Sequence, residues 1–231
     1  MNKRLETGFK MLIAFEGIDG SGKTVQSLAL KAALEERGLT CSLFSFPAYE
    51  MEVGQLIFDH LHDKNQAFAW NPRAVAVLYA TNRMELRSKI AKALADNHIV
   101  ICNRYTHSNV AFQGAKVNQK EQVDFIKWIE KLEFEIFQLP RPDIVIFLKL
   151  APSQTVQFIA AKKEKTEQGA DQYERNQAFL ERVYETYLSL SKSRDNWISI
   201  ECSSGTEVFS KEAIASQIAE KILPHLKVED Q

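Results

Sequence analysis

Apolar positions along the chain fall into two spacings, which predict the strands and helices of an alternating α/β protein. Short continuous apolar runs, typical of strands buried on both faces, occupy residues 11–16, 40–46, 99–102, 143–148 and 197–200. Apolar residues at helical spacing follow residue 24 and recur over residues 53–62, 72–96, 119–138, 179–190 and 206–226. In the segment 119–138, the predicted apolar face carries Phe125, Ile129, Leu132 and Ile136.

The alternation of strands and helices predicts crossover connections and a mostly parallel sheet. The 231 residues contain no Pro-, Gly- or Ser-rich linker and no internal repeat, so we expect a single domain. In such sheets, ligands bind beyond the carboxyl ends of the strands. That rule groups four segments of this chain, namely Asp19 to Lys23, Phe46-Pro47, Asn103 to Tyr105 and the charged loop after Pro152.

Composition and charge limit the class of protein but do not indicate its chemistry. The apolar fraction of 45% and the net charge of −1 give no electrostatic reason to expect a nucleic acid or a membrane as partner. The three cysteines, Cys41, Cys102 and Cys202, are widely spaced and form neither a disulfide framework nor a metal pattern. The first ten residues are polar and lack the apolar core of a signal peptide. We therefore expect a cytoplasmic enzyme or binding protein.

The stretch Gly17-Ile18-Asp19-Gly20-Ser21-Gly22-Lys23-Thr24 fits the pattern glycine, four residues, Gly-Lys-Thr/Ser. It lies between a predicted strand and a predicted helix, which is the context of a phosphate-binding loop. Glycines let successive backbone N–H groups face one anion, and the helix N-terminus adds a partial positive charge. Lys23 can then reach the β- and γ-phosphates, and the Thr24 hydroxyl can bind Mg²⁺. The loop predicts a nucleoside triphosphate ligand but does not identify the phosphoryl acceptor.

Residues at other strand ends and on a helix suggest an acceptor. Arg104 and Tyr105 directly follow a buried strand, where an arginine is costly unless it meets an anion. A bound phosphate and a structural carboxylate are the two alternative partners. Tyr79 and Arg83 lie four residues apart, so they share a helical face. A flat ring beside a planar donor suits a nucleobase, although a plain surface contact has the same spacing.

The segment 162–177 is polar and strongly charged. It carries Lys162, Lys163 and Lys165, followed by Asp171 and Glu174. A solvated loop is one interpretation, and the other is a lid that brings cations over the migrating phosphoryl group and excludes water. Together with the phosphate loop and the acceptor residues, the segment predicts a nucleotide kinase with separate donor and acceptor sites.

Six segments, in this order, resemble the thymidylate kinase (dTMP kinase) family of P-loop nucleoside monophosphate kinases. They are Phe15–Thr24, Phe46–Tyr49, Leu78–Arg83, Asn103–Phe112, Asp171–Glu174 and Ile200–Gly205. The resemblance runs from about residue 10 to residue 225. The order and spacing of the six segments are more specific than any one of them.

The resemblance implies the reaction ATP + dTMP → ADP + dTDP with Mg²⁺. The implied fold is the α/β three-layer sandwich of P-loop kinases, with a five-stranded parallel sheet in the order 2-3-1-4-5 between helices. The resemblance also implies a homodimer, with the helix at 72–96 at or near the contact. The chain would be one thymidylate-kinase-like domain over residues 1–231, with a leader at 1–9 and a lid region at about 153–177.

The resemblance also implies roles for individual residues. The loop 17–24 would hold the ATP phosphates, with Lys23 catalytic and with Thr24, Asp19 and Glu174 near the metal. Arg104 and Tyr49 would hold the acceptor phosphate. Tyr79 would stack on thymine, and Arg83 would bond its carbonyl group. The other implied acceptor residues are Asp19 at the sugar or the metal, Phe46 and Pro47 after the second strand, Ser108 and Asn109 at the base, Phe112 under the sugar, and Asp171 and Glu174 in the lid.

One departure from the family pattern concerns the metal. Asn103 stands where the family usually has Asp, so an amide replaces a carboxylate that normally supports the metal or its waters. The candidates to compensate are Glu16, Asp19, Asp171 and Glu174.

Two further departures concern the cations of the site. Gly20 stands where some relatives carry a catalytic arginine, which shifts the catalytic cation to Lys162, Lys163 or Lys165. Ala48 stands where the family often has a basic residue, which puts more weight on Tyr49.

Two alternative functions stay open on the sequence. One is another deoxynucleoside or deoxynucleoside monophosphate kinase on the same fold, and the other is a non-catalytic nucleotide-binding protein. A deoxynucleoside kinase needs no clamp for an acceptor phosphate, so Arg104 and Tyr49 argue against it. The intact Lys23 and Thr24 argue against a binding protein, whereas Asn103 argues slightly for it.

Overall fold

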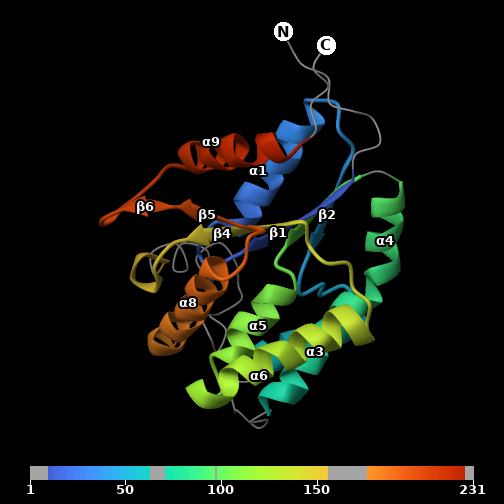
Figure 1. Cartoon of the computed structure of the whole chain (residues 1–231), viewed down its shortest axis with the longest axis vertical. Helices are drawn as coiled ribbons and strands as arrows, with labels where there is room; N and C mark the ends of the chain where they lie inside the picture. The colour runs from blue at the N-terminus through green and yellow to red at the C-terminus, as the bar shows by residue number, and fades with distance from the viewer. Residues whose placement is uncertain (1–9, 63–70, 97, 156–175, 227–231) are drawn as a thin grey trace.

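A five-stranded parallel sheet forms the centre of the molecule (Figure 1). The computed structural model describes residues 10–62, 71–96, 98–155 and 176–226. The strands are β1 (Met11–Glu16), β2 (Cys41–Ser45), β3 (Ile99–Asn103), β4 (Ile144–Lys149) and β5 (Trp197–Glu201), in the order β2-β3-β1-β4-β5. Each neighbouring pair in this sheet is parallel. The predicted strands and the implied order are confirmed.

Helices cover both faces of this sheet, as Figure 1 shows. Helices α1 (Lys23–Glu35) and α9 (Lys211–Ile222) cover one face. The other face is covered by α2 (Glu52–His62), α3 (Pro72–Glu85), α4 (Arg87–Ala95), α5 (Thr106–Gly114), α6 (Gln119–Glu130) and α8 (Gln177–Lys192). Successive side chains of β1 point to opposite faces of the sheet. Leu12 and Ala14 pack on the α5 side, whereas Ile13 and Phe15 pack on the α1 side.

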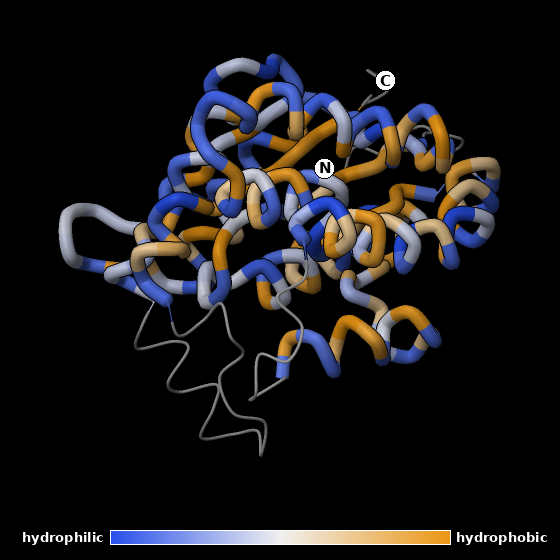
Figure 2. The backbone as a smooth tube through the Cα atoms, turned by 90° about the horizontal axis from the view of Figure 1, so that it is seen from below, coloured by the Kyte–Doolittle hydropathy of each residue, from blue (hydrophilic) through white to orange (hydrophobic). Residues whose placement is uncertain are grey.

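Most helices carry both hydrophilic and hydrophobic residues along their turns (Figure 2). This pattern is expected where each helix places one side on the core. Among the helices of the described ranges, none is both long enough and apolar enough to cross a membrane.

Two predicted helices have different bounds in the structure, and one helix was not predicted. The predicted helix at 72–96 is two helices, α3 and α4, which meet at the buried Leu86. The last helix begins at Lys211 rather than at residue 206, because Ser203–Ser204 (β6) and Glu207–Val208 (β7) form an antiparallel hairpin before it. Helix α5 was not predicted, since its sequence THSNVAFQG shows no apolar periodicity although every one of its residues is buried.

The predicted helix at 119–138 is also different. It is α-helical only to Glu130 and continues as a π-helical segment, η1 (Lys131–Ile136). The wider turns of a π-helix change which side chains face inward. Ile136 is consequently 62% exposed instead of extending the apolar face, while Leu132, Glu133 and Phe134 are buried in succession.

Candidate functional site

The loop between β1 and α1 is built around glycines that no other residue replaces without strain. Gly17, Gly20 and Gly22 have φ values of 144°, 79° and 90°. A Cβ atom on Gly17 would also lie 2.8 Å from the Ser21 hydroxyl and 3.0 Å from the Leu148 carbonyl oxygen. Gly22 is the N-cap of α1 and supplies no side-chain capping bond. The first turn of α1 therefore offers its backbone N–H groups to an anion.

Lys23 and Thr24 occupy defined positions at the start of α1. The Lys23 ammonium group donates to the Ile18 carbonyl oxygen at 2.7 Å, and only 6% of the residue is exposed. The Asn103 side-chain amide donates to the Thr24 hydroxyl at 3.1 Å. Asn103 reaches this point because β3 pairs with β1 and places Asn103 beside Phe15. An amide therefore donates to the hydroxyl where the resemblance predicted a carboxylate.

Arg104, which follows β3, brings a second cation to the loop. Its φ is 66°, and its guanidinium group donates to Asp19 at 2.6 Å, to the Gly17 carbonyl oxygen at 3.1 Å and to the Ser108 hydroxyl at 3.0 Å. Burial is the largest influence and alone would lower the pKa of Arg104, but the charge and hydrogen bond of Asp19, together with the charges of Tyr187 and Glu16, outweigh it and raise the pKa. Arg104 is therefore a fixed positive charge, and its carboxylate partner is itself part of the loop.

Glu16, at the end of β1, serves the fold rather than a ligand. Its carboxylate is fully buried and accepts hydrogen bonds from the backbone N–H groups of Tyr105 at 2.9 Å and Ser108 at 3.0 Å. It also accepts from the Ser108 hydroxyl at 2.6 Å and the Tyr187 hydroxyl at 2.9 Å. Burial raises the pKa of Glu16, and these hydrogen bonds act against it. Glu16 fixes the start of α5, so it is already committed and is a poor candidate to replace the missing carboxylate at Asn103.

Two cavities open at the carboxyl ends of the strands. The larger has a volume of about 640 Å³ and runs from the loop to the β6–β7 hairpin. Its lining comprises Asp19, Gly20, Ser21, Gly22, Lys23, Thr24, Val25, Gln26, Ser45, Phe46, Pro47, Tyr49, Asn103, Arg104, Leu150, Cys202, Val208, Phe209, Lys211 and Ile214. At the hairpin end, Cys202 belongs to the segment Ile200–Gly205 that carries the resemblance, whereas Val208 and Phe209 were not predicted, because their apolar character reads as core and the hairpin has no strong sequence signal.

The smaller cavity has a volume of about 80 Å³ and gathers the predicted acceptor residues that the structure describes. Its lining comprises Asp19, Phe46, Pro47, Tyr49, Leu61, Tyr79, Arg83, Arg104, Ser108, Asn109, Phe112 and Gln113. Leu61 and Gln113 were not predicted. The predicted lid residues Lys162, Lys163, Lys165, Asp171 and Glu174 lie outside the described residues.

The two cavities adjoin each other. Both are lined by Asp19, Phe46, Pro47, Tyr49 and Arg104. The ion pair between Asp19 and Arg104 therefore lies at their boundary. A group bound on the loop and a group bound in the smaller cavity would meet at this pair.

The segment Phe46–Tyr49 is held in place by two helices. Asn82 of α3 accepts from the Ala48 N–H at 2.8 Å and donates to the Ala48 carbonyl oxygen at 3.1 Å. Gly54 of α2 packs so closely that a Cβ atom there would lie 1.9 Å from the Ala48 carbonyl oxygen. Neither residue touches the loop, yet both determine where Phe46 and Pro47 lie.

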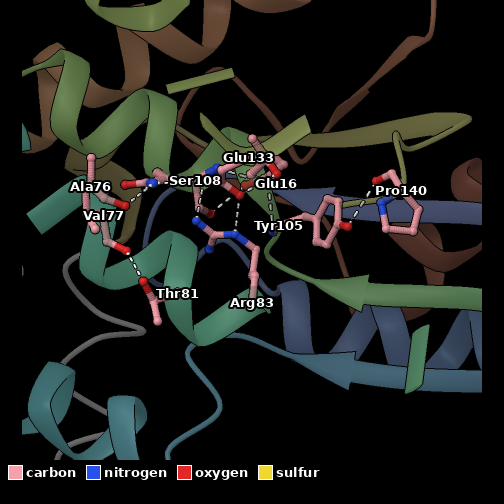
Figure 3. A network of polar contacts seen from close by, with 11 residues as sticks. Glu16, Ala76, Val77, Thr81, Arg83, Tyr105, Ser108, Glu133 and Pro140 are labelled. Carbon is pink, nitrogen blue, oxygen red and sulfur yellow. Dashed lines mark hydrogen bonds and ion pairs between the residues drawn. The ribbon is translucent and has the colours of Figure 1, made fainter. Parts of the chain in front are cut away.

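A buried network of hydrogen bonds forms one end of the smaller cavity (Figure 3). Arg83 of α3 points at Glu133 of η1, and the two form a bidentate pair with distances of 2.6 and 2.5 Å. Glu133 also accepts from the Thr106 hydroxyl and from the Asn109 side-chain amide, both at 2.8 Å. Glu133 was not predicted, and the only sequence signal was an acidic residue between two apolar ones, Leu132 and Phe134.

Comparison with known proteins points to one family. The family model described as thymidylate kinase matches residues 15–222. The thymidylate kinase of Homo sapiens is 32% identical over 197 residues, which cover 85% of this chain and 84% of that protein. The thymidylate kinase of Thermosipho melanesiensis is 29% identical over 218 residues, 93% of this chain and all of that protein. Among solved structures, a thymidylate kinase of Candida albicans superimposes with a TM-score of 0.74 at 24% identity, covering 95% of this chain and 94% of that chain.

Proposed function

This chain belongs to the thymidylate kinase family, and we propose that it carries out that family's reaction across its two adjoining cavities. The reaction is the ATP-dependent phosphorylation of dTMP to dTDP, and the chain is a nucleoside monophosphate kinase. The observation that carries the proposal is the shared lining of the two cavities at Asp19 and Arg104. ATP would occupy the larger cavity and dTMP the smaller one, with the reacting groups at the shared boundary.

The loop supplies the donor half of the site. Backbone N–H groups of residues 17–24 would hold the phosphates of ATP, and Lys23 would neutralise charge on the β- and γ-phosphates. An oxygen of the dTMP phosphate would attack the γ-phosphorus in line, and the bond to the bridging oxygen of ADP would break. The reaction needs no covalent intermediate with the protein, so these residues act by positioning and by charge.

Thr24 and Asp19 would hold Mg²⁺, together with Glu174 outside the described residues. No cluster of three or more His, Cys, Asp or Glu side chains suited to a metal occurs in the described ranges. That absence fits a Mg²⁺ ion bound with a nucleotide, because such an ion takes only one or two protein oxygens and completes its shell with water and phosphate. When bound, Mg²⁺ neutralises charge on the transferred phosphoryl group.

The smaller cavity would supply the acceptor half. Arg104, Tyr49, Phe46 and Pro47 would surround the dTMP phosphate, with Asp19 near the sugar or the metal. Phe112 would lie under the sugar and Tyr79 against the thymine ring. Arg83, Ser108 and Asn109 would bond the base. The burial of Arg83 and Asn109, at 1% and 2% exposed, supports this arrangement because a buried polar pair can read a base without competition from water.

The proposal also covers the catalytic cation, the oligomeric state and the cellular location of the protein. The catalytic cation would be Lys162, Lys163 or Lys165, since Gly20 of the loop has no side chain. The chain would act as a homodimer, with helix α3 at or near the contact. It would work in the cytoplasm. Single alanine substitutions at the three lysines, followed by steady-state kinetics, would identify the cation, and sedimentation equilibrium would test the dimer.

Release of ADP with different acceptors tests the proposed function. We expect turnover with dTMP and much less with dGMP, UMP or thymidine, because only a deoxynucleotide with a thymine-like base and a phosphate satisfies both ends of the smaller cavity. Turnover with thymidine but not with dTMP would indicate a deoxynucleoside kinase. Binding of ATP with no turnover of any acceptor would contradict the proposal.

A further inference from the structure

A single buried carboxylate, Glu133, organises the base end of the smaller cavity. Glu133 has no exposed surface and lies in the π-helical segment η1, whose wide turns bring it inward between Leu132 and Phe134. Glu133 does not line the cavity itself. It contacts two residues that do, Arg83 and Asn109. Any effect of Glu133 on a ligand therefore acts through those two side chains.

Glu133 fixes the direction of the Arg83 guanidinium group. Its two oxygens accept from Nε and Nη2 of Arg83 at 2.6 and 2.5 Å (Figure 3), and both side chains of the pair are buried. Burial alone would lower the pKa of Arg83, but the charge and hydrogen bonds of Glu133 raise it. Nη1 of Arg83 makes no hydrogen bond to any described residue. Arg83 thus contributes a fixed, charged N–H donor to the wall of the cavity.

Glu133 also fixes the direction of the Asn109 side-chain amide. The Asn109 NH₂ group donates to Glu133 at 2.8 Å and to the Ala76 carbonyl oxygen at 2.9 Å. Both partners are pure acceptors, so the amide cannot turn its oxygen toward them. The Asn109 side-chain oxygen is buried and has no hydrogen-bond partner among the described residues. An orphan acceptor of this kind destabilises the protein unless a ligand satisfies it.

We propose that Glu133 is a positioning residue that sets the donor–acceptor order of the base-binding wall. Arg83 donates and Asn109 accepts, which matches a pyrimidine edge with a carbonyl oxygen beside an N–H group, as in thymine. Cytosine presents an amino group beside an unprotonated nitrogen, so it would meet donor with donor and acceptor with acceptor. The inference rests on the proposed function, since it assigns the base specificity of the same acceptor site.

The substitution Glu133→Gln tests the proposal. Glutamine keeps the size of the side chain but replaces one acceptor oxygen with an NH₂ group, which would face the N–H donors of Arg83 or Asn109, so these side chains lose their fixed direction. We expect the ratio of kcat/KM for dTMP over dCMP to fall about tenfold or more, because one matched contact becomes a mismatched one. The KM for dTMP should rise, while the KM for ATP stays within about twofold of the wild type, because the loop is untouched.

Glu135→Gln is the matched control. Glu135 lies two residues further along the same segment but is exposed. This variant should keep the wild-type ratio for dTMP over dCMP. Equilibrium binding of dTMP and dCMP, followed by calorimetry, gives a second reading that does not depend on turnover. Both monophosphates should bind Glu133→Gln with affinities closer to each other than in the wild type.

The outcomes separate this inference from the proposed function. If the wild type does not phosphorylate dTMP, the proposed function fails first. If it does and Glu133→Gln keeps the wild-type ratio, Glu133 is merely structural and the inference is overturned. If Glu133→Gln does not fold, Glu133→Asp replaces it, because the shorter carboxylate keeps the charge but cannot reach both Arg83 and Asn109. We expect Glu133→Asp to lower the same ratio, and an unchanged ratio there overturns the inference equally.

Discussion

The phosphate loop and the base end of the smaller cavity are built in opposite ways. The loop is one continuous stretch, Gly17 to Thr24, and its geometry comes mainly from backbone conformation and from local contacts such as that from Lys23 to Ile18. The base end is made of side chains on separate helices, and Arg83 and Glu133 are fifty residues apart in the sequence.

This difference determines how each region responds to amino-acid substitution. A backbone site tolerates most side-chain changes except at its glycines and at Lys23, because its donors are N–H groups that every residue except proline carries. A side-chain site depends on each member of its network, because removing one partner leaves the others buried and unsatisfied. Substitutions should therefore separate the two regions cleanly.

The largest effect is expected at Lys23. Lys23→Ala should lower kcat about a hundredfold or more, because one buried cation at the transferred phosphates is lost. Lys23 lines the larger cavity but not the smaller one, so the affinity for dTMP should stay close to that of the wild type. Single-turnover kinetics and dTMP binding measure the two quantities. A comparable loss of dTMP affinity would contradict the separation of the regions.

The next effect is expected at Gly54, which supports the acceptor side from outside the cavity. Gly54→Ala should destabilise the protein by about 1–3 kcal/mol and raise the KM for dTMP, because the added methyl group must displace Ala48 and the Phe46-Pro47 segment. Denaturant unfolding and steady-state kinetics measure both.

Gly114→Ala is the matched control for Gly54→Ala. A Cβ atom on Gly114 would meet the side chains of Ile126, at 3.6 Å, and Gln122, at 3.9 Å, which are ordinary contacts. This variant should be neutral or more stable by up to about 1 kcal/mol. Equal effects of the two substitutions would rule out a specific role for the approach of Gly54 to Ala48.

The two regions also differ in how far the sequence predicts them. The loop, all five sheet strands and the cluster of acceptor residues at the strand ends follow from short motifs and continuous apolar runs. Helix α5 does not, because its buried polar residues, such as Thr106 and Asn109, are satisfied by partners distant in sequence. Glu133 does not either, because its burial depends on a π-helical segment that breaks the predicted periodicity after Ile129.

His107 of helix α5 makes the stability of the protein depend on pH. Burial, and next the charge of Arg194, lower the pKa of His107 from 6.5 to about 3. Between these values the unfolded chain binds a proton that the folded chain does not, so stability falls as the pH falls from about 6.5 toward 3. One such proton contributes at most about 1.4 kcal/mol per pH unit.

Urea unfolding at several pH values between about 6.5 and 5 tests this prediction. The wild type should lose stability faster with falling pH than His107→Gln, in which the titrating ring is absent. Glu130 and Arg194 face His107 and remain in both proteins, so they do not produce the difference. Identical slopes for the two proteins would mean that His107 binds its proton over the same pH range in the folded and the unfolded chain.

The smallest effect is expected at Asn103, beside the loop. Asn103→Asp should lower the Mg²⁺ concentration for half-maximal activity a few-fold, because a carboxylate next to Thr24 replaces an amide that donates to it. A Mg²⁺ titration at fixed ATP measures the change. The ratio of kcat/KM for dTMP over dCMP serves as an internal control and should not change. An unchanged titration would mean that position 103 does not contribute to the metal.

In the proposed function, the donor and acceptor cavities meet at Asp19 and Arg104. A compound in which adenosine and thymidine are joined by a polyphosphate chain spans both cavities, and its binding by calorimetry tests the claim most directly. We expect one molecule per chain, displaced by ATP and by dTMP alike, with an affinity above that of either nucleotide alone. Displacement by ATP but not by dTMP would contradict the claim.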